Sequence, residues 1–123
     1  MDSRHNYFYP LRIRPGGRTV ALSEYGGIAW PMPGHEPPGK TYGYGTAKDK
    51  ADLTKRYKML QWKTILPQLG RGLSALVYTQ LTDVEDEVNG LFTYDRAALK
   101  PEAAAVRSCN AALAAEFAKV TAK

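Results

Sequence analysis

Glu24 stands where a carboxylate could do chemistry. It lies in the segment TVALSEYGGIAW, residues 19–30, directly after a short apolar run and shortly before two glycines and a tryptophan. The interior of a buried strand would reject a glutamate, because an ionised carboxylate is costly to bury, whereas a surface loop would accept one anywhere. The end of a buried strand that opens onto a reaction site would require one. The position of Glu24 therefore favours a catalytic carboxylate at the end of a strand.

The elements that would position Glu24 can be predicted from the apolar pattern. Residues 19–24 begin with a continuous apolar run, which is typical of a buried strand in a parallel sheet covered on both faces. Residues 28–48 form a long loop with four prolines and four glycines. A helix is expected from about Asp49, its N-cap, to residue 69, with Pro67 loosening its last turn.

The second half of the chain repeats this order. Residues 72–83, GLSALVYTQLTD, are rich in strand-forming residues, and Asn89-Gly90 indicates a turn between short apolar stretches. A final helix is expected from Pro101, with Cys109 as a small core residue on its apolar stripe. The order strand, loop, helix, strand, loop, helix predicts an α/β protein with a parallel sheet, whose working residues lie at the strand ends.

Composition excludes several classes of partner. The net charge of +5 could suggest nucleic acid, but Lys55, Arg56, Lys58 and Lys63 alternate with apolar residues at helical spacing, as on a solvated helix face. No apolar stretch has the length needed to span a bilayer. Cys109 is the only cysteine, which rules out an internal disulfide. We therefore expect a cytoplasmic protein with no nucleic-acid partner, no membrane association, no metal and no cofactor.

Two longer motifs carry a family resemblance. LSEYGG, followed downstream by GLSALVYTQLTDVEDEVNGLFTYDR, resembles the end of the catalytic barrel of glycoside hydrolase family 2, which includes β-galactosidases, β-glucuronidases and β-mannosidases. The opening HNYFYP resembles the aromatic segment that precedes the nucleophile strand of that barrel. The resemblance implies that residues 1–123 are the C-terminal portion of a (β/α)8 TIM barrel, its last two to three βα units. The strands ending at Glu24 and Gln80 would be the seventh and eighth of the barrel.

The same resemblance assigns roles to three residues. It makes Glu24 the nucleophile of a retaining β-glycosidase, which attacks the anomeric carbon and forms a covalent glycosyl-enzyme that water then hydrolyses. Tyr7 would hydrogen-bond this carboxylate, and His5 would line the sugar site. For His5 and Tyr7 the alternative is an ordinary aromatic terminus that packs on the sheet.

Three further residues are candidates for substrate binding. Trp30 would form a wall of the site by stacking on a sugar, or would instead anchor the loop in the core. Tyr78 and Gln80 point from a strand end toward the mouth of the site. For each of them, a buried hydrogen-bonding role without substrate contact is the alternative.

The acidic segment DVEDE could imitate an acid/base pair or a metal site, but we interpret Glu85 and Glu87 as structural residues that pair with groups such as Arg96. The family's acid/base glutamate follows an asparagine, and the sequence contains no Asn-Glu dipeptide. The sequence thus predicts part of a retaining β-glycosidase that carries the nucleophile, lacks the acid/base residue, and is inactive alone. It would bind β-glycosides and self-associate through exposed barrel edges. A non-catalytic carbohydrate-binding or assembly module of small α/β fold is the alternative.

Overall fold

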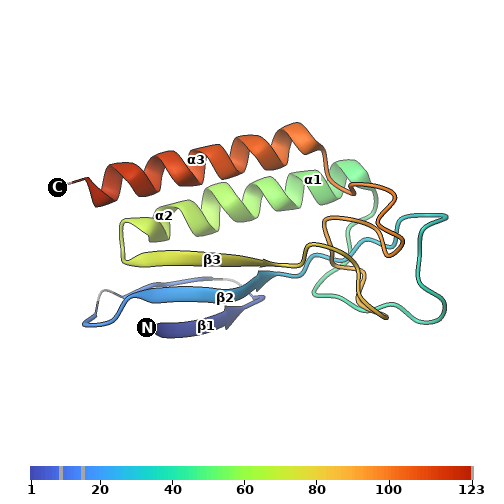
Figure 1. Ribbon diagram of the computed structural model, residues 1–123, viewed down its shortest axis with the longest axis horizontal. Coiled ribbons are helices and arrows are strands. Elements are labelled where there is room, and N and C mark those ends of the chain that lie inside the picture. The colour runs from blue at the N-terminus through green and yellow to red at the C-terminus, as the bar shows by residue number, and fades with distance from the viewer. Residues whose placement is uncertain (9, 15, 123) are drawn as a thin grey trace.

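The computed structural model describes residues 1–8, 10–14 and 16–122; Tyr9, in the HNYFYP segment, lies outside them. Three parallel strands form one sheet in the order β1-β2-β3: β1 (Asp2–Asn6), β2 (Val20–Gly26) and β3 (Leu73–Thr79). The helical segments lie on one side of this sheet (Figure 1): α1 (Lys50–Met59), the π-helical η1 (Leu60–Ile65), α2 (Leu66–Leu69) and α3 (Ala103–Thr121). The long loops gather at the carboxyl ends of the strands.

The two predicted strands pair as expected. Residues of β2 lie beside residues of β3 in parallel register, with Leu22 opposite Leu76. The prediction of parallel strands joined through a helical segment is therefore confirmed. Leu22 and Leu73 are fully buried and pack with Ile65 of η1 in the hydrophobic core, so burial of these apolar side chains holds the helical layer on the sheet.

β1 was not predicted as a strand. Its sequence, DSRHN, contains no apolar residue, so it gives no hydrophobic alternation to detect. Its backbone nevertheless pairs with β2 from Asp2, opposite Val20, to Asn6, opposite Tyr25. The Arg4 guanidinium contacts the Asp2 carboxylate along this edge of the sheet. Charge on an edge strand discourages further strand pairing there.

The long helical region is interrupted at its centre. Asp49 caps α1 as predicted, because its carboxylate accepts a hydrogen bond from the Asp52 N–H at 2.8 Å. Pro67 has no N–H, and its ring crowds the carbonyl four residues before it. The preceding turns are wound as a π-helix, in which the Leu66 N–H bonds the Gln61 carbonyl five residues back.

The turn predicted at Asn89-Gly90 lies in the segment after β3. Among the described residues, positions 80–100 form isolated bridges and turns instead of two paired strands around Asn89-Gly90. Gly90 serves close backbone approach, since a Cβ there would come within 2.2 Å of the Asp83 nitrogen. The Asn89 side chain is fully buried and makes hydrogen bonds. The dipeptide therefore marks a tightly packed loop.

The predicted portion of a TIM barrel is wrong. In the described part of the chain the sheet is open, and β1 and β3 each pair only with β2. The predicted burial of residues 19–24 on both faces holds for Val20, Ala21 and Leu22, whereas β3 has exposed side chains such as Val77, which is 57% exposed. The motifs predicted the local order of strands and helices. Closure of a barrel requires further strands at both edges of the sheet, and the local order does not predict them. The fold is a small α/β sheet with one helical layer.

Candidate functional site

Glu24 lies near the carboxyl end of β2, and the side chains of Tyr7 and His5 approach the same carboxylate oxygen. The Tyr7 hydroxyl donates a short hydrogen bond to Glu24 Oε2 and lies 3.4 Å from the Thr79 hydroxyl. His5 lies opposite Glu24 in the register of β1 and β2, and its Nδ1 is 3.3 Å from the same oxygen. All three strands therefore contribute to the position of this one carboxylate.

Tyr7 is a neutral hydrogen-bond donor at physiological pH. Partial burial, together with its hydrogen bond to Glu24, raises the pKa of Tyr7 to about 12. Removing the phenolic proton would place two negative oxygens side by side, so the proton stays on Tyr7. The Glu24 carboxylate is thus held by an O–H donor that does not titrate near neutrality.

Gly26 and Gly27 follow shortly after Glu24, and because they lack a Cβ they leave room for aromatic rings to pack against the end of β2. Gly27 has φ +65°, and a Cβ there would lie 2.6 Å from the Tyr44 ring and 3.0 Å from the Tyr7 ring. These two rings stack at 3.8 Å between centroids, with 7° between their planes. Gly26, at φ +98°, makes the same close approach to the Tyr78 ring. The GG pair therefore shapes an aromatic wall beside Glu24.

Glu24 opens into a cleft of about 390 Å³, which we call the acidic cleft. Besides Glu24 its lining includes Tyr7, Tyr78, Gln80 and Glu87. It has two carboxylates, and no lysine or arginine occurs among the described residues that line it. A pocket of this kind, with aromatic walls and a few fixed polar groups, suits a small polar ligand rich in hydroxyl donors.

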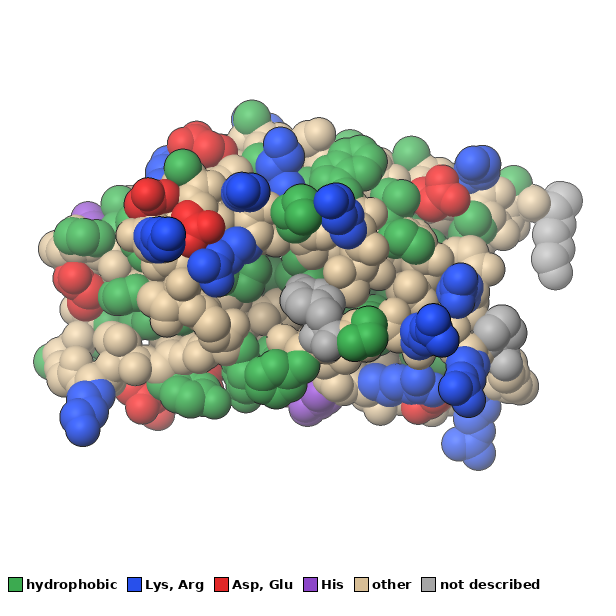
Figure 2. All heavy atoms as spheres, turned by 180° about the vertical axis from the view of Figure 1, so that it is seen from behind, with side chains coloured by type: hydrophobic (Ala, Val, Ile, Leu, Met, Phe, Trp, Pro, Cys, Tyr) green, Lys and Arg blue, Asp and Glu red, His purple; other side chains and the backbone are tan. Residues whose placement is uncertain are grey.

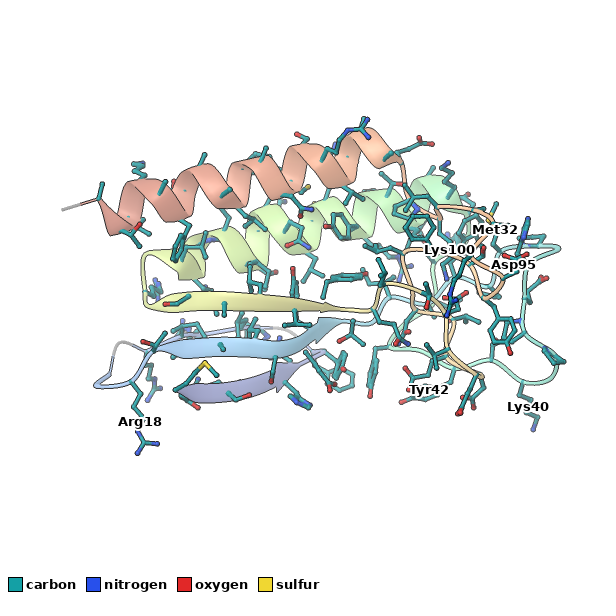
Figure 3. All side chains as sticks on the ribbon, in the orientation of Figure 1. Arg18, Met32, Lys40, Tyr42, Asp95 and Lys100 are labelled. Atoms are coloured by element: carbon teal, nitrogen blue, oxygen red, sulfur yellow. The ribbon has the colours of Figure 1, made fainter. Side chains whose placement is uncertain are left out.

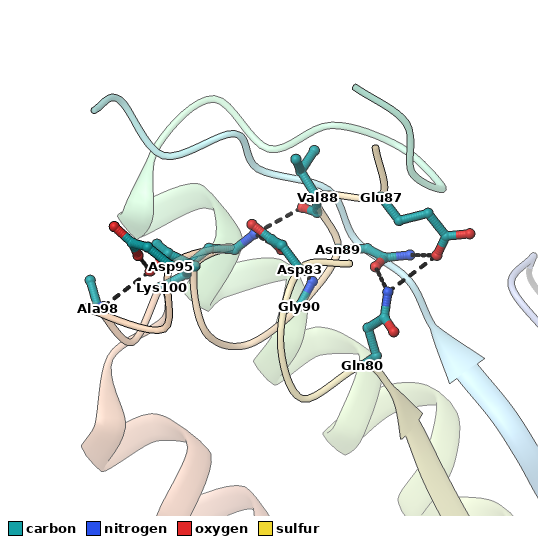
Figure 4. A network of polar contacts seen from close by, with 10 residues as sticks. Gln80, Asp83, Glu87, Val88, Asn89, Gly90, Asp95, Ala98 and Lys100 are labelled. Carbon is teal, nitrogen blue, oxygen red and sulfur yellow. Dashed lines mark hydrogen bonds and ion pairs between the residues drawn. The ribbon is translucent and has the colours of Figure 1, made fainter. Parts of the chain in front are cut away.

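Glu87 is the second carboxylate of the acidic cleft, and amides fix it (Figure 4). Gln80 Nε2 donates to Glu87 Oε2 at 3.2 Å and to Asn89 Oδ1 at 2.8 Å. Asn89 Nδ2 donates to the same Glu87 oxygen at 3.2 Å. The sequence suggested Arg96 as a partner for this acidic segment, whereas the structure pairs Glu87 with two amides. The sequence indicated a structural role for Glu87, and the structure places it in the lining of the cleft beside Glu24, a position that depends on the path of the loop.

A buried ion pair anchors that loop. Lys100 Nζ lies 2.7 Å from Asp83 Oδ1 and donates to the Val88 carbonyl at 2.8 Å, with its side chain fully buried. The Gly90 N–H donates to the same Asp83 oxygen at 2.8 Å. Burial lowers the pKa of Lys100 and raises that of Asp83. Lys100 lies among the loops, whereas Lys40 points outward (Figure 3).

The structure brings most of the candidate residues to one place. His5 and Tyr7 contact Glu24, while Tyr78 and Gln80 line the same cleft. Trp30 lies elsewhere. Only 9% of it is exposed, and it packs in the hydrophobic core, while its backbone N–H donates to the Val88 carbonyl.

A second cleft, of about 610 Å³, shares the Tyr7 and Tyr44 side chains with the acidic cleft. We call it the basic cleft, because Lys55, Arg56 and Lys63 of the helical layer line it. Arg56 is already paired with an aspartate one turn earlier, at 3.1 Å. Seen from behind, basic side chains occur at several places on the surface, mixed with hydrophobic ones (Figure 2). The interpretation of Lys55 and Lys63 as part of a solvated helix face stays a prediction.

Comparison with known proteins adds no family. A scan against models of known protein families finds no match, and a search of curated proteins finds no significant match. None of the helices in the described residues combines the length and the apolar character needed to cross a membrane. Within the same residues, no group of three or more His, Cys, Asp or Glu side chains is arranged to hold a metal ion.

Proposed function

We propose that the acidic cleft binds a β-glycoside and that Glu24 is the nucleophile of a retaining β-glycosidase site. The observation that carries this proposal is the geometry at Glu24: a carboxylate at the end of a parallel strand, with Tyr7 and His5 both on Oε2. Because the Tyr7 hydroxyl and the His5 Nδ1 atom both lie against Oε2, Oε1 is the oxygen left to attack. The resemblance to glycoside hydrolase family 2 supports the same residue.

The chemistry assigned to Glu24 is substitution at the anomeric carbon. Oε1 forms a bond to that carbon while the bond to the leaving oxygen breaks and takes its electron pair with it. Water then attacks the anomeric carbon of the glycosyl-enzyme while the bond from that carbon to Oε1 breaks; the water loses one proton to solvent, the sugar is released and the Glu24 carboxylate is restored. The Tyr7 hydroxyl keeps the carboxylate oriented during both steps.

The leaving group also requires a proton, and the described site assigns no residue to supply it. Glu87, the other carboxylate of the cleft, accepts hydrogen bonds from two amides, an arrangement that suits an ionised acceptor. Loss of acid assistance typically lowers the rate of such a step by about 10²–10⁴-fold. We therefore expect Glu24 to react only with donors whose leaving group departs without protonation.

The test is covalent labelling of the purified chain. We would incubate it with dinitrophenyl 2-deoxy-2-fluoro-β-glycosides of the gluco, galacto and manno series and measure its intact mass. We expect the mass to increase by one sugar with at least one series, and the Glu24→Gln variant to stay unlabelled. Ordinary alkyl β-glycosides should give no turnover.

The second candidate function is carbohydrate binding without catalysis. The absence of an assigned proton donor among the described residues favours it. Binding of a free sugar, seen as chemical-shift changes in the nuclear magnetic resonance spectrum, without labelling by any activated donor would support this alternative and contradict the role of Glu24 as nucleophile.

A further inference from the structure

We propose that Glu87 determines the specificity of the acidic cleft and selects neutral hexosides over uronides. This inference rests on the proposed function and adds a substrate class to it. The observation is the charge of the lining: Glu24 and Glu87 are both carboxylates, and no lysine or arginine is found among the described residues of the cleft. The whole chain, by contrast, carries a net charge of +5.

Glu87 is held in place by its side-chain contacts. Its Oε2 accepts from both Gln80 and Asn89, and Gln80 also donates to Asn89, so the three side chains form a closed triangle. Asn89 is fully buried, which fixes one corner of the triangle. Because both amides contact Oε2, Oε1 is the oxygen available to a ligand.

The backbone beside Glu87 is also fixed. The Val88 N–H donates to the Tyr42 carbonyl at 2.9 Å, and the Val88 carbonyl accepts from the Trp30 N–H at 2.9 Å. The same carbonyl accepts from the buried Lys100 ammonium at 2.8 Å. Because this segment is held by three hydrogen bonds, the Glu87 carboxylate cannot move far from a negatively charged ligand.

This arrangement distinguishes two sugars that differ in one group. A neutral hexoside presents hydroxyl donors, which a carboxylate accepts well. A uronide replaces the primary alcohol with a carboxylate and would put a third negative charge in the cleft. The basic residues that could neutralise it, Lys55 and Lys63, line the other cleft. Like charges a few ångströms apart near a protein surface cost enough to lower affinity by about tenfold or more.

The experiment compares labelling rates for a neutral donor and its uronide, both with the same leaving group, in the series that labels the protein. In the wild type we expect the neutral donor to react at least about tenfold faster. In Glu87→Gln, which keeps an oxygen to accept from the amides, we expect the ratio to fall by about tenfold through faster labelling by the uronide. Asp86→Asn removes an adjacent, exposed charge and should leave the ratio unchanged.

Several results would overturn the inference. If the neutral donor and the uronide label the wild-type protein equally fast, the inference is wrong before any variant is tested. It is also wrong if labelled Glu87→Gln shows the same ratio of rates as the wild type. A loss of rate in Glu87→Gln that grows with the pKa of the leaving phenol would make Glu87 an acid catalyst instead. If no donor labels Glu24, the proposed function itself is wrong. Labelling of Glu24 without a preference between the two donors would contradict only the specificity role of Glu87.

Discussion

The acidic cleft and the basic cleft share the stacked rings of Tyr7 and Tyr44 but are built differently. In the acidic cleft, Glu24 accepts a hydrogen bond from Tyr7 and is contacted by His5 of β1, and Glu87 accepts hydrogen bonds from two amides. In the basic cleft, Lys55 and Lys63 are exposed about two turns apart on the helical layer. Long exposed side chains keep their rotamer freedom, and their charges are screened by solvent.

The comparison shows that fixed geometry distinguishes the two clefts better than their size or charge. The basic cleft is the larger, about 610 against about 390 Å³, and it carries the sign of the whole chain. The acidic cleft opposes the net charge and holds its carboxylates with hydrogen-bonded neighbours.

The largest expected effect comes from Lys100→Met, which removes the cation under the acidic cleft. Asp83 would keep its carboxylate with only 2% of its side chain exposed and no counter-ion. Breaking a buried ion pair by removing one partner typically costs about 3–5 kcal/mol. We expect the free energy of unfolding, measured by urea denaturation, to fall by this amount. Lys119→Met, on the exposed part of α3, is the matched control and should change it little.

Gly27→Ala tests the packing of the Tyr7 and Tyr44 rings, which line both clefts. A Cβ would overlap the rings of Tyr7 and Tyr44 and would also force alanine into a left-handed backbone. Gly34→Ala shares the positive φ but has open space around it. We expect Gly27→Ala to lower the free energy of unfolding by about 1–3 kcal/mol more than Gly34→Ala. Equal losses from the two substitutions would show that the ring contacts impose no packing constraint.

Tyr7→Phe removes the hydroxyl donor to Glu24 while keeping the stacked ring. A hydrogen bond to a charged group contributes about 1.5–3 kcal/mol, so we expect labelling of Glu24 to slow by about 10- to 100-fold. The measurement is the labelling rate with the activated donor, beside the melting temperature. Tyr94→Phe, at an exposed tyrosine, should leave the rate unchanged. An unaltered rate in Tyr7→Phe would contradict the positioning role of this hydroxyl.

The smallest effect is expected in the basic cleft. If Lys55 and Lys63 form a solvated helix face, replacing both with glutamine should change the labelling rate of Glu24 by less than about twofold. The preference for a neutral donor over its uronide should also stay as in the wild type. A large change in either quantity would mean that the basic cleft takes part in substrate binding, and the contrast between the clefts would fail.

The predictable parts of the fold are those with a local apolar signal. The run before Glu24 and the run within LSALVYT predicted β2 and β3, and Asp49 predicted the start of α1. β1 carries no such signal, because its side chains are polar and its pairing with β2 comes from the backbone. The barrel prediction failed for a related reason: the motifs report local order, and they carry no information on whether the sheet closes.

The candidate site shows the same limit. Glu24 could be singled out from its position in the sequence, and its approach to Tyr7 was suggested by the family resemblance. Glu87 was interpreted as structural, and its place in the cleft lining could not be predicted, because it depends on how residues 80–100 fold around buried Lys100. Trp30 resembles a sugar-stacking residue in sequence, but apolar surface is buried wherever the fold allows, and here it lies in the core.

The two carboxylates of the acidic cleft have different proposed roles: Glu24 is the nucleophile and Glu87 selects the substrate. The most direct measurement is peptide mapping by mass spectrometry of the protein labelled with the activated 2-fluoro donor. We predict that the sugar is attached to Glu24 and that Glu87 remains unmodified. A sugar attached to Glu87, or a wild-type protein that no activated donor labels, would contradict this assignment.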